Sequence, residues 1–314
     1  MTASDPFQPF AGRKVLVTGA RGFLGSHLVR LLAAARADVT AVSRGAEDGT
    51  QGAVRWLRAD LARESAVEDL LQAVRPEYVF HFASHGVGSP DRENVLPTFM
   101  TDLASTVAML EAATRQGVQR MMLASSLEEP IPDSGEIVPS SPYAAAKWAG
   151  GAYARMFQRL YGTPVVMTRP YMVYGPRQRA HKLIPYVILT LLRGERPQLA
   201  SGRREVDWIY VDDVLEGMSV AMLAPGAEGR TFDLGTGTLV SIRDAVELVV
   251  QLMGASVQPL FGALPDRPVE QERAADVATT VEKLGWKART SLEEGLSRTI
   301  EWYRLNSTAD SPLR

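Results

Sequence analysis

Short runs of apolar residues alternate with longer segments whose apolar positions recur every three or four residues through the first half of the chain. The short runs are typical of buried strands and the longer segments of amphipathic helices. This alternation predicts βαβ units and a parallel sheet. The predicted strands cover residues 14–20, 38–44, 78–84, 120–126 and 164–170. The predicted helices cover residues 26–37, 64–75, 98–118 and 142–161.

After Tyr171 this rhythm loosens, and segments 173–185, 192–204 and 260–275 are rich in Pro, Gly and Arg. They indicate loops of a smaller region that follows the sheet. We therefore expect an α/β fold with a Rossmann-like, doubly wound parallel sheet and a smaller mixed α/β region toward the C-terminus.

The overall charge excludes some classes of partner. With 34 basic and 36 acidic residues, the formal net charge of -2 gives no field that would attract nucleic acid or an anionic membrane. The chain has no cysteine, which rules out thiol catalysis and disulfides, and its four histidines have no metal-ligand spacing. The first residues show neither a basic leader nor an apolar core, and the chain has no run of 18 apolar residues, so we expect a cytoplasmic protein without a membrane segment or a metal.

Three glycines, Gly19, Gly22 and Gly25, follow the first predicted strand and open the first predicted helix. Glycine allows backbone N–H groups to approach a pyrophosphate, which then lies at the positive end of the helix. A tight turn would also use glycines, but the strand, the spacing and the helix together favour a dinucleotide-binding loop.

The second predicted strand ends where the adenosine ribose of a dinucleotide lies, and the residues there are Ser43 and Arg44. The glycine loop adds Arg21. Basic residues at this place favour the 2′-phosphate, so we expect NADP(H) as the preferred cofactor, with NAD(H) as the alternative. The competing interpretation is two solvated arginines.

Tyr143 and Lys147 stand four residues apart and therefore on one face of the helix at 142–161. A lysine beside a phenol stabilises the phenolate and lowers its pKa toward a useful range for acid/base chemistry. Ser125 and Ser126 end the preceding strand, where either hydroxyl could bind a substrate oxygen. This set suits hydride transfer with proton relay at a carbinol or carbonyl.

The segments TGARGFLG, ASSLEE, YAAAK, RPYMVYGPRQ and DWIYVDDV occur in this order. Together they resemble the extended short-chain dehydrogenase/reductase family, the NAD-dependent epimerases and dehydratases that modify nucleotide sugars. The resemblance covers about residues 12 to 305. It implies that Tyr143 is the acid/base, that Lys147 holds the nicotinamide ribose, and that Ser126 orients the sugar hydroxyl or ketone.

The resemblance also implies the remaining site residues. Asp60 and Leu61 match the place where the family holds adenine, Ala83 matches the strand end against the cofactor, and Arg267 matches an arginine that grips the diphosphate. The cofactor-binding set is then Gly19, Arg21, Gly22, Phe23, Leu24, Gly25, Ser43, Arg44, Asp60, Leu61, Ala83, Tyr143, Lys147 and Pro170. The substrate-binding set is Ser125, Arg177, Arg204 and Arg267.

On this basis we expect a dinucleotide-binding domain in residues 1–170, to which 206–250 return. A substrate-binding cap comprises 171–205 and 251–305, and a tail comprises 306–314. In relatives, the helix that carries the tyrosine and lysine packs with the helix before it against their copies, so the resemblance implies a homodimer.

Four departures from the family pattern change the expected substrate side. The family usually has Tyr-Gly after the catalytic serine, where this chain has Leu-Glu-Glu-Pro. Met172 stands in place of an asparagine, Val206 in place of an arginine, and Asp102 in place of an asparagine. Arg203 or Arg204 could substitute for the arginine that Val206 replaces.

Glu128 stands two residues after Ser126, where related 4,6-dehydratases place the glutamate that removes a proton from C5. A dehydratase normally carries an acid at the intervening position, and here that residue is Leu127. Glu128 is therefore a catalytic candidate whose roles include binding a substrate hydroxyl and acting as the base of an epimerisation. The alternative is a solvated loop carboxylate.

The sequence favours an NADPH-dependent 4-ketoreductase acting on a nucleoside-diphosphate 4-keto-6-deoxy sugar, an enzyme of deoxysugar biosynthesis. The first alternative is a 4-epimerase or 4,6-dehydratase that retains its NAD(P)+. The second is a sensor that binds dinucleotide without catalysis, against which the presence of Ser126, Tyr143 and Lys147 argues.

Overall fold

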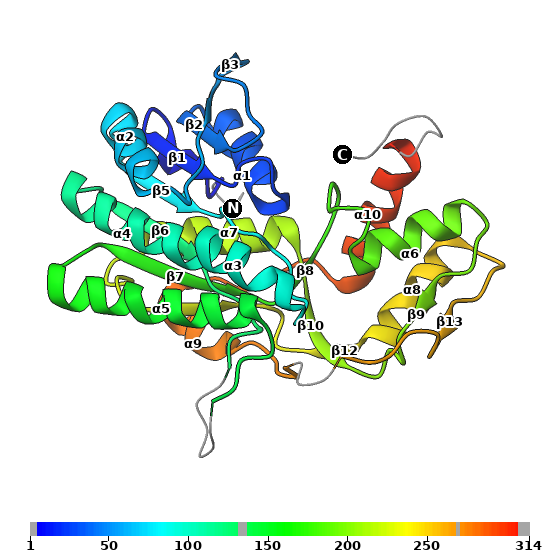
Figure 1. Cartoon of the computed structure of the whole chain (residues 1–314). Coiled ribbons are helices and arrows are strands. Elements are labelled where there is room, and N and C mark those ends of the chain that lie inside the picture. The colour runs from blue at the N-terminus through cyan, green and yellow to red at the C-terminus, as the bar shows by residue number, and fades with distance from the viewer. Residues whose placement is uncertain (1–4, 131–136, 268–270, 307–314) are drawn as a thin grey trace. The chain divides into compact units, whose positions relative to one another are not determined.

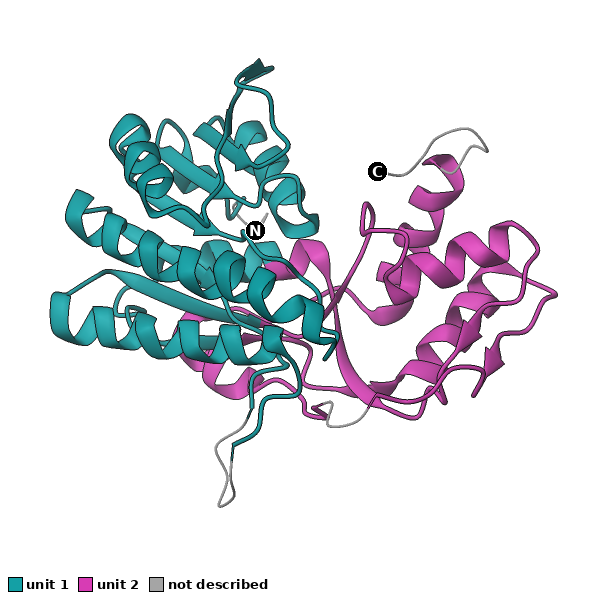
Figure 2. Cartoon of the chain, viewed as in Figure 1, with its two compact units in different colours: residues 1–169, 215–232 teal, residues 170–214, 233–314 magenta. Residues whose placement is uncertain are grey.

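The computed structural model describes residues 5–130, 137–267 and 271–306. The chain divides into two compact units, shown in separate colours in Figure 2. Unit 1 comprises residues 1–169 and 215–232, and unit 2 comprises residues 170–214 and 233–314. Residues 131–136 of the predicted dinucleotide-binding domain, residues 268–270 of the predicted cap and residues 307–314 of the predicted tail lie outside the described residues.

In the described ranges, one large sheet has eight strands in the order β11-β7-β6-β5-β1-β2-β4-β3. The pairs from β7 through β4 are parallel, and β3 is antiparallel to β4. The strands are β1 (Lys14–Thr18), β2 (Asp38–Ser43), β3 (Gly49–Gln51), β4 (Val54–Arg58), β5 (Tyr78–His81), β6 (Arg120–Ala124), β7 (Val165–Pro170) and β11 (Thr231–Leu234).

This strand order fixes where a ligand can bind. Strand β1 lies between β2 and β5, so the chain winds away from β1 in both directions. In such sheets ligands bind beyond the carboxyl ends of the strands at the point where the order reverses. The carboxyl ends of β1 and β5 therefore mark the expected cofactor site, and the predicted doubly wound fold is confirmed.

Three amphipathic helices cover one face of this sheet. Helices α2 (Glu64–Val74), α4 (Ser105–Gln116) and α5 (Pro142–Tyr161) place Leu71, Met109 and Phe157 in one buried cluster with Leu16 and Met121 of the strands. Figure 1 shows α4 and α5 on the near side of β6 and β7. Helix α1 (Phe23–Ala34) packs against β1 and β2.

Unit 2 is a smaller α/β arrangement. Strand β10 pairs in parallel with β8 and antiparallel with β12, while β13 pairs with β9 in a second sheet. Helices α6, α8 and α10 pack together. The bounds are β8 (Met172–Tyr174), α6 (Leu183–Leu192), β9 (Gln198–Leu199), β10 (Glu205–Tyr210), β12 (Leu239–Ser241), α8 (Ile242–Met253), β13 (Leu260–Phe261), α9 (Val277–Leu284) and α10 (Leu292–Asn306), and α7 (Val211–Leu223) runs from unit 2 into unit 1.

Some predicted elements differ from the structure. Strand β4 was not predicted, because the charged residues in VRWLR hide its alternation. The segments expected to be loops contain the short strands β8, β9 and β13, and α6 begins inside one of them. The helix predicted at 98–118 is divided into α3 (Val95–Thr98), a π-helical turn η3 (Phe99–Ala104) and α4. Short 3₁₀ turns occupy Gln8–Phe10 and Arg92–Asn94.

Candidate functional site

Two glycines at the junction of β1 and α1 have no room for a side chain. Gly19 has a φ of 64°, and a Cβ placed on it would lie 2.5 Å from the Phe82 carbonyl oxygen. A Cβ on Gly25 would lie 2.3 Å from the carbonyl oxygen of Gly19. Gly22 is the N-cap of α1, whose first turn contains Phe23 and Leu24. This bare backbone at a helix N-terminus fits a dinucleotide pyrophosphate.

A buried threonine joins the strand ends that flank this loop. The Thr18 hydroxyl oxygen accepts hydrogen bonds from the backbone N–H groups of Phe82 and Ala83, at 3.1 and 3.2 Å, and lies 2.9 Å from His81 Nδ1. Because the oxygen accepts from two N–H groups, its own proton is directed at Nδ1. Thr18 therefore fixes the β5 end, including Ala83, against the glycine loop.

His81 is held in its neutral form. Burial, and then the charge of Lys147, lower its pKa to about 3. With Nδ1 accepting from Thr18, the ring proton lies on Nε2, which is 3.5 Å from the Ser105 hydroxyl oxygen. Neither its burial nor its link to Lys147 could be inferred from the spacing of histidines along the sequence.

The basic residues predicted to select NADP(H) lie around the end of β2. Arg21 Nη1 donates to the Gly45 carbonyl oxygen at 2.5 Å, and its guanidinium lies over the Trp56 ring, 5.5 Å from the centroid. The Ser43 hydroxyl oxygen accepts from the Gly45 N–H at 3.3 Å, and Arg44 is exposed. Arg21 is thus anchored at the end of β2, whereas Arg44 lies exposed there.

The predicted adenine-binding pair lies beyond the neighbouring strand. Asp60 and Leu61 follow the end of β4, with Asp60 exposed and Leu61 buried. The Asp60 carboxylate accepts from the backbone N–H of Ala62 at 3.3 Å, which shapes the turn into α2. Pro170 is the last residue of β7.

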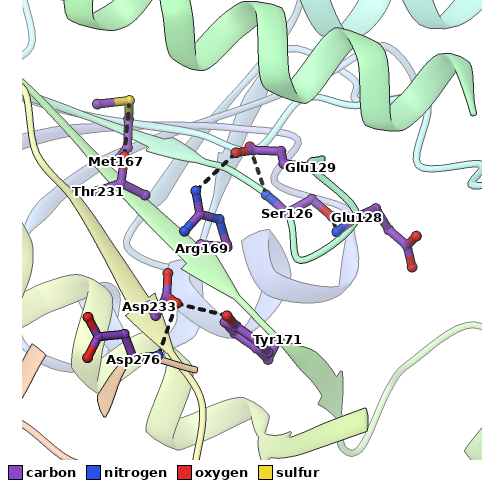
Figure 3. Close-up of polar contacts among 9 residues, drawn as sticks. All are labelled: Ser126, Glu128, Glu129, Met167, Arg169, Tyr171, Thr231, Asp233 and Asp276. Carbon is purple, nitrogen blue, oxygen red and sulfur yellow. Dashed lines mark hydrogen bonds and ion pairs between the residues drawn. The ribbon is translucent and has the colours of Figure 1, made fainter. Parts of the chain in front are cut away.

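The loop after β6 carries the two candidate serines, both buried. The Ser125 N–H donates to the Thr168 carbonyl oxygen at 2.8 Å, so Ser125 continues the sheet. The Ser126 hydroxyl oxygen accepts from the Glu128 N–H at 3.2 Å. The Glu128 side chain is half-buried and points away from Ser126 and Arg169 in Figure 3.

Helix α5 begins where its sequence requires. The Ser141 hydroxyl oxygen accepts from the Ala144 N–H at 3.1 Å, Pro142 occupies the first turn, and the helix ends at Gly162 in the left-handed region. Tyr143 and Lys147 therefore share a face of the first two turns. Lys147 Nζ donates to the Ala124 carbonyl oxygen at 2.9 Å and lies 5.6 Å from the Tyr143 ring centroid.

A small cavity lies under Lys147, lined among others by His81, Asp102, Thr106 and Ser125. Asp102 is buried in the π-helical turn η3, where its carboxylate accepts from the Ser84 hydroxyl and from the His85 N–H, each at 2.6 Å. A π-helical turn inside a helix often accompanies a functional site. Here it turns Asp102 toward the loop after β5.

Sequence reasoning missed one buried charge pair in unit 1. Glu129 Oε2 lies 3.3 Å from Arg169 Nη2, and Glu129 Oε1 accepts from the Ser126 N–H at 3.2 Å (Figure 3). Only 4% of Glu129 is exposed. The sequence does show a second acidic residue, Glu129, where the family usually has Tyr-Gly. Its partner Arg169 lies 40 residues further along the chain, so the pairing could not be inferred from local sequence.

In unit 2, cationic side chains gather near the start of α6. The pKa of Lys182 is lowered by burial and then by the charges of Arg179 and Arg267, so the three cations lie close together. The Ser201 N–H donates to Asp266 at 2.9 Å, which fixes the loop that carries Arg267. Such a cluster can bind a diphosphate.

The other predicted substrate residues of unit 2 have separate anchors. Arg204 Nη2 donates to the Gln271 carbonyl oxygen at 2.8 Å, and Arg177, at a φ of 64°, lies 5.9 Å from the Trp302 ring centroid. Val206 is buried in β10 and Met172 is half-buried in β8. Arg204 and Arg177 are therefore each held by contacts within the protein.

Comparison with known proteins decides the family. The model of the NAD dependent epimerase/dehydratase family matches residues 15–235. The chain belongs to this family. It is 31% identical to a probable dTDP-glucose 4,6-dehydratase of Sinorhizobium fredii, with 96% of this chain and 95% of that protein covered. It is 32% identical to a UDP-glucose 4-epimerase of Mycolicibacterium smegmatis, with 94% and 99% covered.

Solved structures of the epimerase/dehydratase family have the same fold. A UDP-glucose 4-epimerase of Thermotoga maritima with UDP-glucose superposes with a TM-score of 0.85 at 28% identity, covering 93% of this chain and 99% of that one. A dTDP-glucose 4,6-dehydratase of Streptomyces venezuelae with NAD and TYD bound superposes with a TM-score of 0.84 at 28% identity, covering 96% of this chain and 99% of that one. The predicted family, enzyme class and use of a nicotinamide dinucleotide are confirmed.

Two features are absent from the part of the chain that the structure describes. None of the helices there combines the length and apolar character needed to cross a bilayer. The same residues contain no group of three or more His, Asp or Glu side chains placed to hold a metal ion.

Proposed function

We propose that this epimerase/dehydratase family member interconverts alcohol and ketone at C4 of a nucleoside-diphosphate sugar, and that it is a 4-epimerase which retains its dinucleotide. The observation that carries the proposal is the position of Lys147, bonded to the Ala124 carbonyl oxygen and lying beside the Tyr143 ring. The bond to Ala124 puts the Lys147 ammonium at the end of β6, directly before Ser125 and Ser126, and this supports the proposal.

The chemistry of these residues follows from their contacts. The bound dinucleotide supplies the hydride acceptor and donor. Tyr143 takes the proton of the C4 hydroxyl and returns it, with the Lys147 ammonium 5.6 Å from its ring centroid. The Ser126 hydroxyl accepts from the Glu128 N–H and keeps its own proton for the substrate oxygen. Neutral His81 adds no second positive charge below Lys147.

The cationic cluster of unit 2 supports a diphosphate substrate. Arg179, Lys182 and Arg267 lie close enough for their charges to depress the pKa of Lys182. An anion that binds among them relieves this repulsion, and a diphosphate offers several oxygens to one cluster. We assign this cluster to the diphosphate of the nucleotide sugar.

A 4-epimerase is preferred to a 4,6-dehydratase because of Leu127. This side chain is buried and apolar, so it cannot protonate a hydroxyl that leaves C6. Glu128 is a candidate substrate ligand or base, and its side chain is half-buried. Epimerisation at C4 needs no acid at residue 127.

The 4-ketoreductase favoured by the sequence is the second candidate. Its support is the arrangement at the end of β2, where Arg21 and Ser43 both bond to Gly45 and Arg44 is exposed. Positive charge at this edge suits the 2′-phosphate of NADPH, a cofactor that reductases consume and release.

Product analysis separates these candidates. The purified protein is incubated with UDP-glucose or dTDP-glucose, and separately with a nucleoside-diphosphate 4-keto-6-deoxy sugar and NADPH, and the sugar is followed by NMR. An epimerase inverts C4 without consuming added dinucleotide, whereas a reductase consumes NADPH stoichiometrically with a 4-keto-6-deoxy sugar. Protein that retains dinucleotide yet converts neither class of substrate would be a sensor and would overturn the proposal.

A further inference from the structure

The serine loop after β6 is closed by its own hydrogen bonds. The Glu128 N–H donates to the Ser126 hydroxyl oxygen at 3.2 Å, and the Glu129 N–H donates to the Ser126 carbonyl oxygen at 3.1 Å. The Ser126 N–H donates to the Glu129 carboxylate at 3.2 Å. Three bonds therefore converge on Ser126, and one of them depends on the side chain of another residue, Glu129.

The Glu129 side chain is a buried carboxylate. Glu129 is 4% exposed, and a buried carboxylate is tolerated only when it is paired and hydrogen-bonded. Arg169, near the end of β7, supplies the pairing at 3.3 Å. Figure 3 shows Glu129 lying between Ser126 and Arg169, while Glu128 points elsewhere.

The pair links the serine loop to the rigid sheet. Arg169 belongs to β7, and β7 pairs in parallel with β6, so the backbone that carries the guanidinium is part of the sheet. Glu129 bonds to both Arg169 and the Ser126 N–H, so the ion pair holds the Ser126 N–H in position relative to the sheet. The family's usual Tyr-Gly is absent from the loop, and the carboxylate holds it instead.

We propose that Glu129, held by Arg169, is a positioning residue that fixes Ser126 for its contact with the substrate oxygen at C4. The proposal rests on the proposed function. A misplaced orienting group costs turnover more than substrate affinity, because its contact is strongest in the transition state.

The first test replaces Glu129 by an apolar residue of smaller size. Glu129→Val removes the acceptor of the Ser126 N–H, and kcat should fall by about 10-fold to 100-fold, while KM for the nucleotide sugar changes by less than about 3-fold. Glu129→Gln keeps an oxygen acceptor and should recover a large part of the lost kcat.

The control is a second ion pair at the start of β6, the strand whose other end leads into the serine loop. Arg120, the first residue of β6, pairs with Glu228, and both lie in unit 1. Glu228→Val removes a carboxylate from a partly buried arginine without touching the serine loop. It should lower the melting temperature and leave kcat unchanged.

A double variant separates positioning from stability. Glu129→Val removes the carboxylate that pairs with Arg169 and should therefore lower the melting temperature. Adding Arg169→Met removes the other charge of the pair and should restore part of the melting temperature. The kcat should stay low, because the Ser126 N–H still lacks its acceptor. If kcat returns together with the melting temperature, Glu129 is only structural and the proposal is wrong.

The same assays distinguish failure of the proposed function. If Tyr143→Phe is as active as the wild type, the proposed chemistry fails whatever Glu129 does. If Tyr143→Phe is inactive and Glu129→Val is fully active, the proposed chemistry stands and the positioning role is refuted.

Discussion

The neutral state of His81 makes the stability of the protein depend on pH. Burial and the charge of Lys147 lower the pKa of His81 from 6.5 to about 3 in the folded protein. In the unfolded chain the imidazole regains its ordinary pKa. Between these two pKa values the unfolded state binds a proton at His81 and the folded state does not. The free energy of unfolding therefore decreases as the pH falls from 6.5 toward 3.

The size of this effect follows from the two pKa values. At about pH 7.5 both states are almost unprotonated at His81, and its contribution is close to zero. At about pH 5 the unfolded state is protonated and the folded state is not, which costs about 2 kcal/mol of folding free energy. Only 3% of His81 is exposed, so solvent screens this effect little.

His81→Gln keeps a polar side chain between Thr18 and Ser105 but cannot take up a proton. Urea unfolding of both proteins at the two pH values gives four free energies of unfolding. The wild type should lose about 2 kcal/mol more than the variant between about pH 7.5 and pH 5, since all other groups cancel in the difference. Equal losses, or a larger loss in the variant, would refute a neutral His81.

Three further predictions concern catalysis, cofactor and assembly. Tyr143→Phe should lower turnover by about 10²-fold or more with unchanged melting temperature, whereas Lys147→Ala should also weaken dinucleotide binding in calorimetric titrations; an active Tyr143→Phe contradicts this. The wild type should bind NADPH more tightly than NADH, and Arg44→Asp should reverse the order in fluorescence titrations; tighter NADH in the wild type contradicts it. Exposed apolar residues on α3 and α5, among them Leu96 at 72% and Leu160 at 65%, should be covered in a homodimer, so light scattering should give a dimer at micromolar concentration and Leu160→Glu a monomer.

Several features were determined by residues close together in the sequence. The glycine loop depends on a strand, three glycines and a helix that follow one another directly, and a Cβ on Gly19 or Gly25 would collide with backbone. Tyr143 and Lys147 share a helix face through their spacing of four. Local periodicity records which face of an element is buried, so the parallel sheet and the helices could be predicted from it.

Other features were decided only by tertiary structure. Glu129 meets Arg169 because β6 and β7 are neighbours in the sheet, and Thr18 meets His81 because β5 lies beside β1. Asp102 reaches the loop after β5 through a π-helical turn that divides the predicted helix. The choice of partner in each case depends on strand order and on packing across the sheet. These are properties of the assembled chain, and no single segment contains them.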